Sequence, residues 1–403
     1  MGFLSKKLGI KALSIEDPSQ PLLPYSALFE SLGLGRSDAG NLVNETQAMR
    51  LTTMFACVNI ISQDLSTLPM NIYEVNPDDS VKIAKSHRLF PLLHNKPNPT
   101  MTSLVFRKAL LANALAWGNG YAFIRRDNAS RAISLHILPP TVTSPVQVDG
   151  VLKYATTATT DGAVSYIDVA DMIHLKGLTL SGEIGLSPVQ TCKNAFGLSL
   201  AQESFSARFY GNGLRTTGVL SHPENLDAEA YENLKKSIHE IATGENAMRP
   251  LILEEGMTWT QMSIAPNDAQ FVESRNFQVR EICSLYRVST TLVGDLSRAT
   301  HSNTEQLSRD HLLFCLMPWA KNLEEELTSK LLTGNFIVEH DFSEFLRADF
   351  TSQTAGLKLL RDVGAYSAND IRRALRQNPI PEEMGGDVRL APLNMVPIES
   401  LVK

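Results

Sequence analysis

The chain has 403 residues, 43% of them hydrophobic and 20% charged, which is typical of a globular protein of two or three domains and excludes a disordered chain. The formal net charge of −6 argues against a protein that grips DNA phosphates tightly, because such proteins are usually basic. No apolar run approaches the roughly 18–20 residues that cross a bilayer, so we expect no membrane partner.

The first half of the chain predicts an α+β unit. Residues 1–45 carry scattered proline and glycine without a sustained period, so we expect a flexible arm. Hydrophobic periods and turn residues then predict helices at 52–65 and 103–117 and strands at 70–75, 121–125, 133–138, 145–154 and 172–176. Gly118 is expected to end the second helix.

A helix rich in small residues follows. Ser187 supplies a cap, Pro188 suits the first helical position and Gln190 can close a capping box, which predicts a helix to about residue 210. Ser199 and Ala201 are among its small residues, which let a neighbouring helix approach closely at some cost in helix stability. We therefore expect this face to pack against a copy of the same helix in another subunit.

A small unit comes next in the chain. Strands near 218–220, 250–254 and 257–264 and a helix at 228–242 are expected. A unit of this size buries little surface alone, so it should lean on a partner or a neighbouring copy. Asn267 then caps a helix that should run to about residue 287.

Residues 288–302 read as a loop held between two capped helices. The long helix expected at 303–333 places Leu323, Leu327 and Leu331 on one face. Pro318 lies inside this helix, lacks an N–H and crowds the carbonyl of Phe314, which predicts a kink. A strand at 336–339, helices at 352–363 and 368–376, and a tail rich in proline and glycine complete the chain.

The sequence contains none of the common catalytic or ligand-binding motifs that we searched for. These are the phosphate loop, the dinucleotide-binding fingerprint, HExxH, GxSxG and the calcium-binding loop. The Gly-Asn-Gly runs at 118–120 and 211–213 follow helices, so stop signals are favoured over phosphate binding. His174 lies in an apolar strand pattern, which favours a structural histidine over a metal ligand or base. The four cysteines are far apart without a CxxC, which excludes a disulfide scaffold and disfavours zinc. We expect no enzyme activity, cofactor or metal.

Two other classes stay open. A metal-dependent nuclease would need clustered carboxylates, and the spacing of the nearest set, Asp341, Glu344 and Asp349, does not converge. Another ring-forming virion protein, or a membrane-ring protein, would share the small-residue helix packing.

An ordered series of short motifs resembles the portal (head-to-tail connector) proteins of tailed bacteriophages, in the shorter form typical of long-tailed phages. The motifs are Asn95-Lys-Pro-Asn-Pro-Thr-Met-Thr, Trp117-Gly-Asn-Gly-Tyr-Ala, Met172-Ile-His-Leu-Lys-Gly, Gly185-Leu-Ser-Pro-Val, Phe209-Tyr-Gly-Asn-Gly, Leu253-Glu-Glu-Gly-Met-Thr-Trp, Asp268-Ala-Gln-Phe-Val-Glu-Ser-Arg and Ser302-Asn-Thr-Glu-Gln. They run in order from about residue 50 to 345, which a membrane ring or nuclease would not share.

The resemblance implies the portal fold, with an α/β wing, a two-helix stem, a small α/β clip, a long kinked helix and a helical crown. Carried onto this chain, the divisions are 1–45 (arm), 46–186 (wing), 187–213 (first stem helix), 214–266 (clip), 267–287 (second stem helix), 288–302 (tunnel loop), 303–349 (kinked helix and the rest of the wing) and 350–403 (crown and tail). One departure is Arg287-Val288-Ser289-Thr290, where relatives usually carry prolines after the valine, so we expect this loop to move more freely.

The resemblance also implies a function. Subunits would form a dodecameric ring at one capsid vertex of the virion, assembled in the host cytoplasm. Double-stranded DNA would pass through it without sequence readout, in packaging by the large terminase, in retention and in ejection. A head–tail adaptor and the major capsid or scaffold protein would be further partners. The acidic charge fits such a channel, because strong phosphate contacts would hinder sliding.

The resemblance further implies roles for individual residues. The tunnel loop would use Leu292, Val293, Gly294, Leu296, Arg298 and His301. Subunits would pack in the stem through Phe196, Ser199, Ala201, Arg275 and Arg280. The clip would face the terminase with Tyr231, Lys235, Lys236 and Glu254, and Pro318 would kink the long helix.

Overall fold

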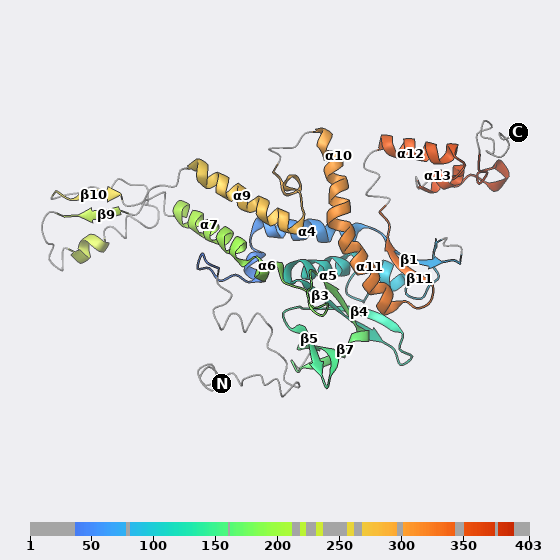
Figure 1. The fold of residues 1–403 in the computed structure, drawn as a ribbon, viewed down its shortest axis with the longest axis horizontal. Coiled ribbons are helices and arrows are strands. Elements are labelled where there is room, and N and C mark those ends of the chain that lie inside the picture. The colour runs from blue at the N-terminus through green and yellow to red at the C-terminus, as the bar shows by residue number, and fades with distance from the viewer. Residues whose placement is uncertain are drawn as a thin grey trace.

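The computed structural model describes the α+β fold that the sequence predicts, over most of the chain from residue 37 onward (Figure 1). The described residues are 37–77, 81–159, 162–211, 218–222, 231–236, 256–261, 268–295, 301–342, 350–374 and 378–390. The predicted strand at 250–254 and most of the predicted arm lie outside them. The predicted arm extends too far, because Ser37 and Val43 are already buried.

The helices begin and end close to the predicted positions. They are α3 (Glu45–Ala48), α4 (Thr52–Thr67), α5 (Ser103–Trp117), α6 (Pro188–Thr191), α7 (Lys193–Gly211), α9 (Asp268–Tyr286), α10 (His301–Asp310), α11 (Met317–Leu331), α12 (Phe350–Asp362) and α13 (Ala368–Ala374). Single turns are η1 (Pro91–Asn95), η2 (Val169–Asp171), η4 (Thr290–Val293), η5 (His311–Leu316) and η7 (Glu382–Met384), with η1 and η5 π-helical. Residues 231–236 are also helical.

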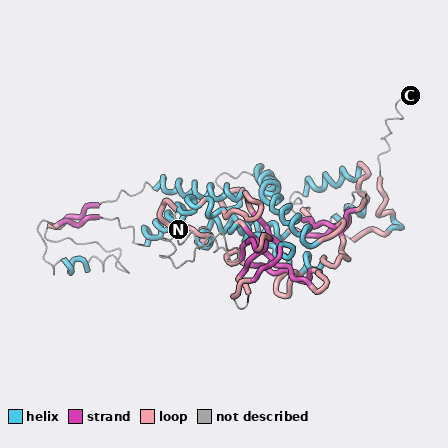
Figure 2. Tube along the Cα trace, turned by 60° about the horizontal axis from the view of Figure 1, so that its bottom comes forward, coloured by secondary structure: helices cyan, strands magenta, loops and turns pink. Residues whose placement is uncertain are grey.

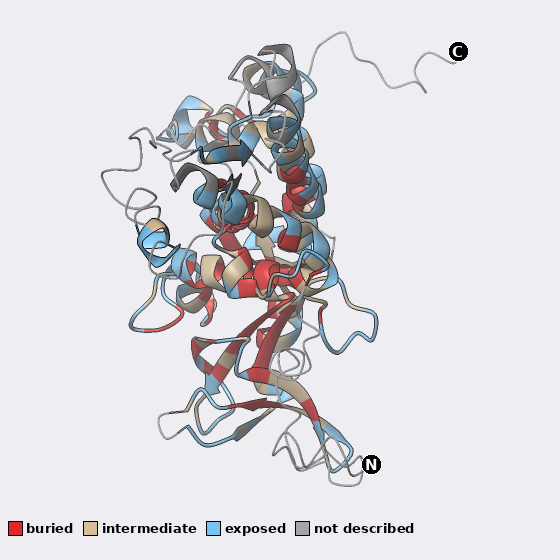
Figure 3. Ribbon diagram, turned by 90° about the vertical axis from the view of Figure 1, so that its left-hand side faces the viewer, coloured by how far each residue is buried: buried red, intermediate tan, exposed pale blue. Residues whose placement is uncertain are grey.

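Local signals explain the central helix α5. Thr102 caps it by accepting a hydrogen bond from the Val105 N–H, and Gly118 ends it in the left-handed conformation at φ 74°. Apolar residues at helical spacing, among them Leu111 and Leu115, then bury its inner face. Helices α4 and α5 pack together, and buried residues concentrate here (Figure 3).

Within the described residues, four antiparallel sheets flank or extend from this helical core (Figure 2). Their strand orders are β11 (Phe336–His340), β1 (Met70–Val75), β2 (Val81–Ile83); β4 (Ala132–Leu138), β3 (Asn119–Arg126), β8 (Met172–Lys176); β5 (Thr143–Val148), β6 (Val151–Thr156), β7 (Ser165–Asp168); and β10 (Thr258–Gln261) with β9 (Gly218–Ser221). The single strand predicted at 145–154 is wrong. Asp149 and Gly150 both have positive φ and turn it into the β5–β6 hairpin.

The long helix is interrupted rather than uniform. It starts at His301, two residues before the predicted position, and passes through η5 before continuing as α11. The predicted leucine stripe is confirmed as buried, since Leu323, Leu327 and Leu331 are 0%, 1% and 9% exposed. Figure 1 shows α7 and α9 extending side by side from the main body, with β9 and β10 beyond their far ends.

Candidate functional site

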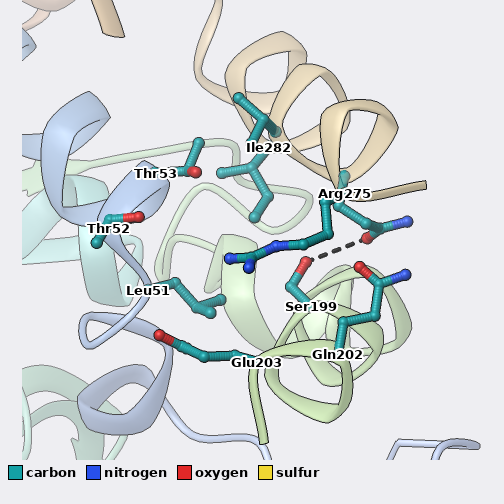
Figure 4. Close-up of a pocket in the computed structure, with 10 residues that line it drawn as sticks. Leu51, Thr52, Thr53, Ser199, Gln202, Glu203, Arg275 and Ile282 are labelled. Atoms are coloured by element: carbon teal, nitrogen blue, oxygen red, sulfur yellow. Dashed lines mark hydrogen bonds between the residues drawn. The ribbon is translucent and has the colours of Figure 1, made fainter. Parts of the chain in front are cut away.

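Helices α7 and α9 are joined by hydrogen bonds within the chain (Figure 4). The Ser199 hydroxyl and the Gln278 side-chain amide are 3.1 Å apart, and Gln202 Nε2 donates to Ser274 Oγ at 2.8 Å. Ser199, Gln202 and the buried Ser206 follow a spacing of 3 and 4, so they share one helix face. Ser199 therefore contacts the chain's own α9, and because its side chain is only half-buried, the expected contact with another subunit stays a prediction.

Phe196 is also used inside the chain. Its side chain is 0% exposed and belongs to the main hydrophobic core. The next residue, Gly197, lies directly against Ser37 in the segment before α3. A Cβ added to Gly197 would lie only 2.1 Å from Ser37 Oγ, so this turn of α7 is covered by that segment. The expectation that Phe196 packs between subunits is wrong, since it has no exposed surface left to offer.

Leu198, Ala201 and Phe205 form an apolar stripe on the outside of α7, which we call the α7 stripe. Their spacing of 3 and 4 places them on one face. The leucine is 42% and the phenylalanine 41% exposed, with Ala201 half-buried between them. On α9, Phe277 is 58% exposed. The sequence-based expectation named Ala201 but not Leu198 or Phe205, although the 3, 4 spacing of the stripe was readable in the sequence.

The two arginines expected at subunit contacts lie on different sides of α9. Arg275 lines a cleft between the start of α4, α7 and α9, and Figure 4 shows its guanidinium near Leu51 and Glu203. Arg280 is exposed, and its Nε donates to the carbonyl of Asn276 one turn earlier. A role of either arginine between subunits stays a prediction.

The described part of the predicted loop is ordered by its own hydrogen bonds. Val288 is 4% exposed and its N–H donates to the carbonyl of Cys283. Ser289 Oγ accepts from the Thr291 N–H at the start of η4, and Gly294 ends that turn at φ 104°. The first part of the predicted loop at 288–302 therefore contains the short turn η4, and the mobility of the loop stays a prediction.

The tunnel-loop residues fall into three groups. Leu292 is 44% exposed and Gly294 is exposed, whereas Val293 packs against the main core and offers less free surface than expected. Leu296 and Arg298 lie outside the described residues. His301 is the first residue of α10 rather than part of a loop. A role next to DNA stays a prediction for all of them.

Pro318 lies at the start of α11, directly after the π-helical turn. Without an N–H it cannot donate to the carbonyl of Phe314, and that carbonyl instead accepts a hydrogen bond from Arg287 Nη1 at 3.4 Å. Arg287 follows α9 in the left-handed conformation at φ 56°. The proline thus frees an acceptor that ties the end of α9 to the long helix, a contact that the sequence did not reveal. The kink itself stays a prediction.

The predicted clip is described in part. Tyr231, Lys235 and Lys236 are exposed on the helical residues 231–236, and Lys235 pairs with Glu232 at 3.5 Å. Strands β9 and β10 pair in antiparallel fashion. Glu254 lies outside the described residues. These positions are exposed at the surface, and their role in facing the terminase stays a prediction.

His174 has the structural role that the sequence favoured. Its Nδ1 lies 3.0 Å from the Tyr154 hydroxyl and its Nε2 lies 2.9 Å from Asn119 Oδ1, so both ring nitrogens are occupied. Burial, with smaller contributions from Lys176 and Lys330, lowers the pKa of His174 to about 2. The ring therefore stays neutral and holds β8 to β3 and to the β6 sheet.

The described residues do not support the alternative of a metal-dependent nuclease, which would need a cluster of carboxylates. Asp341 follows β11, whereas Glu344 and Asp349 lie outside the described ranges. Where the structure describes the chain, no group of three or more His, Cys, Asp or Glu side chains could hold a metal ion. No helix among those residues is long and apolar enough to cross a bilayer.

Comparison with known proteins identifies the family. The phage portal protein family model matches residues 52–375, and the chain belongs to this family. The portal protein of Enterobacteria phage HK97 is 31% identical over 371 residues, covering 89% of this chain and 85% of that protein. The probable portal protein of Streptomyces phage phiC31 is 25% identical over 389 residues, covering 92% and 84%. Portal proteins are structural components of the virion, not enzymes.

Solved structures agree on the fold. A chain from the virion of a native gene transfer agent particle superposes with a TM-score of 0.58 at 22% identity, covering 89% of this chain and 100% of that one. A portal protein of the HK97 family from Corynebacterium diphtheriae gives 0.58 at 12% identity, covering 76% and 98%. A chain from a native particle neck computed with C12 symmetry gives 0.54 at 22% identity, covering 88% and 99%.

Proposed function

We propose that the protein forms a closed ring of identical subunits at one capsid vertex, through which double-stranded DNA enters during packaging and leaves during ejection. The observation that carries the proposal is the family match across residues 52–375, which includes α7, α9, η4 and the long helix together. Twelve copies are proposed from the C12 symmetry of a neck that contains a similar chain. We keep the wing, stem, clip and crown divisions as part of this proposal.

The α7 stripe is our candidate for subunit contact. A ring needs heterologous contacts, in which two different surfaces of each subunit meet. An exposed stripe at helical spacing is suited to packing against a helix of the next copy, whereas Ser199 and Phe196 are already used inside the subunit. Ala201, between Leu198 and Phe205, would keep its proposed interface role.

Contact with DNA is proposed for the segment 288–302, without sequence readout. Leu292 is exposed and apolar, so it cannot bond to phosphates. The formal charge of −6 repeats on every copy, which opposes tight binding of phosphates. The large terminase and the head–tail adaptor are proposed to bind the exposed face of 231–236, and the capsid or scaffold protein the outer wing.

Electron microscopy of the purified protein tests the ring. Wild-type protein should show closed rings with a central channel. Phe205→Glu should give monomers with unchanged circular dichroism, because a carboxylate would be buried without a partner at the contact. Val151→Glu is the matched control, since Val151 is 57% exposed but lies at the β5–β6 turn. Intact rings from Phe205→Glu would reject the α7 stripe as the interface, and wild-type particles without a channel would reject the ring.

A further inference from the structure

Two buried thiols from distant parts of the chain lie in contact. Cys57 belongs to α4 and Cys283 to α9, 226 positions later, and their Sγ atoms are 3.9 Å apart. Both are free thiols with exposures of 0% and 1%. The pair therefore lies inside the contact between a central helix and the α7–α9 pair.

The surroundings make the two sulfur atoms unequal. The Cys57 S–H is directed at Cys283 Sγ, and this hydrogen bond lowers the pKa of Cys283 while it raises that of Cys57. We expect Cys283 to be the thiol of the pair that reacts first, because the thiolate is the reactive form. The nearby Cys315 is engaged elsewhere: its thiol donates to the Tyr286 carbonyl at 3.4 Å, and burial raises its pKa to about 12.

We propose that Cys57 and Cys283 form a disulfide when the protein meets hydrogen peroxide, and that this bond fastens α9 to α4. Cys283 attacks the peroxide and becomes a sulfenic acid with loss of one water. Cys57 then attacks that sulfur and displaces a second water. In sum, two thiols lose two electrons and two protons, and one peroxide becomes two waters. The sulfurs must approach by about 2 Å to reach disulfide length.

The pair would stay reduced in a cytoplasm and oxidise in a particle released to an oxidising exterior. The bond would then tie the proposed stem to the proposed wing after assembly. This timing rests on the proposed function, whereas the chemistry of the pair does not.

The test uses full-length protein purified in reductant, desalted and treated with hydrogen peroxide. The peroxide is then removed and the protein is unfolded in guanidinium chloride with N-ethylmaleimide, because the buried thiols react with the label only in the unfolded chain. Reduced protein should take up four labels, one for each cysteine, and oxidised protein two. Peptide mapping should link Cys57 to Cys283. The thermal midpoint should rise by a few degrees on oxidation and return with dithiothreitol, because a cross-link over so long a loop restricts the unfolded chain.

Variants make the assignment specific. Cys57→Ala and Cys283→Ala should each abolish the intrachain disulfide. Cys192→Ala is the matched control, since Cys192 is half-buried and thus more exposed than the pair, and it should leave the disulfide unchanged. A disulfide to Cys192 or Cys315, bonds only between chains, or four labels after peroxide would overturn the proposal. Micrographs of the same samples report on the ring independently, so a missing ring would refute the proposed function without affecting this result.

Discussion

Gly118, where α5 ends, offers the sharpest test of how the fold is held together. Its φ of 74° is left-handed, a conformation that costs an L-residue about 1–2 kcal/mol. A Cβ at this position would also lie 2.2 Å from the Leu186 carbonyl oxygen, 2.5 Å from its carbon and 2.9 Å from the Ser187 nitrogen. These are backbone atoms, so no side-chain rotation can relieve the overlap. Gly118→Ala must therefore displace the chain that leads into α6.

The matched control is Gly150→Ala. Gly150 has φ 76° in the β5–β6 turn, and a Cβ there would meet nothing within 4 Å. Both substitutions carry the same left-handed cost and the same loss of freedom in the unfolded chain, which offset each other in part. The difference between them isolates the overlap, which we expect to cost about 1–3 kcal/mol, the usual range for overpacking.

The assay is urea unfolding followed by tryptophan fluorescence, with Trp117 next to the substituted residue. Equal protein concentration is needed because an oligomer's stability depends on it. Gly118→Ala should lower the midpoint well beyond Gly150→Ala with an unchanged slope. Equal midpoints for the two variants would refute the reasoning, since the close approach of Leu186 would then carry no energetic weight.

Three further predictions concern the core, pH and DNA. Leu327→Ala should cost about 2–5 kcal/mol by urea unfolding, because the side chain is 1% exposed, whereas Leu359→Ala, at 64% exposure, should stay within about 0.5 kcal/mol. For His174, whose pKa is lowered from 6.5 to about 2, the unfolded chain takes up the proton first as pH falls below 6.5. Stability should thus drop by about 2 kcal/mol at about pH 5, and His174→Gln should show a flatter profile from neutral pH downward. Leu292→Lys should strengthen DNA binding in low salt and steepen its salt dependence, measured by fluorescence anisotropy, while Leu292→Gln should match the wild type.

Local signals made the element order of this chain readable. Ser187 as a cap, Gly118 as a stop and the 4, 4 spacing of Leu323, Leu327 and Leu331 each act within a few residues. The error at 145–154 was a missed local signal. Asp149 and Gly150 form the two-residue turn of the β5–β6 hairpin, and Asp-Gly between alternating apolar residues is a typical sequence pattern for such a turn.

The family could be inferred from the ordered motifs, and with it the fold class and the ring hypothesis. Which side chains of α7 are buried inside the subunit and which are exposed on its surface was decided by tertiary structure alone. Small residues on α7 allow another helix to approach closely, but they do not show whether that helix belongs to the same chain or to another subunit. In the structure Ser199 contacts Gln278 of the same chain, whereas Leu198 and Phe205 are exposed. The contact of Cys57 with Cys283 likewise joins positions 226 apart. Periodicity and capping depend on residues that are close in the sequence. Packing partners depend on contacts between segments that are distant in the sequence, so they follow only from the whole tertiary structure.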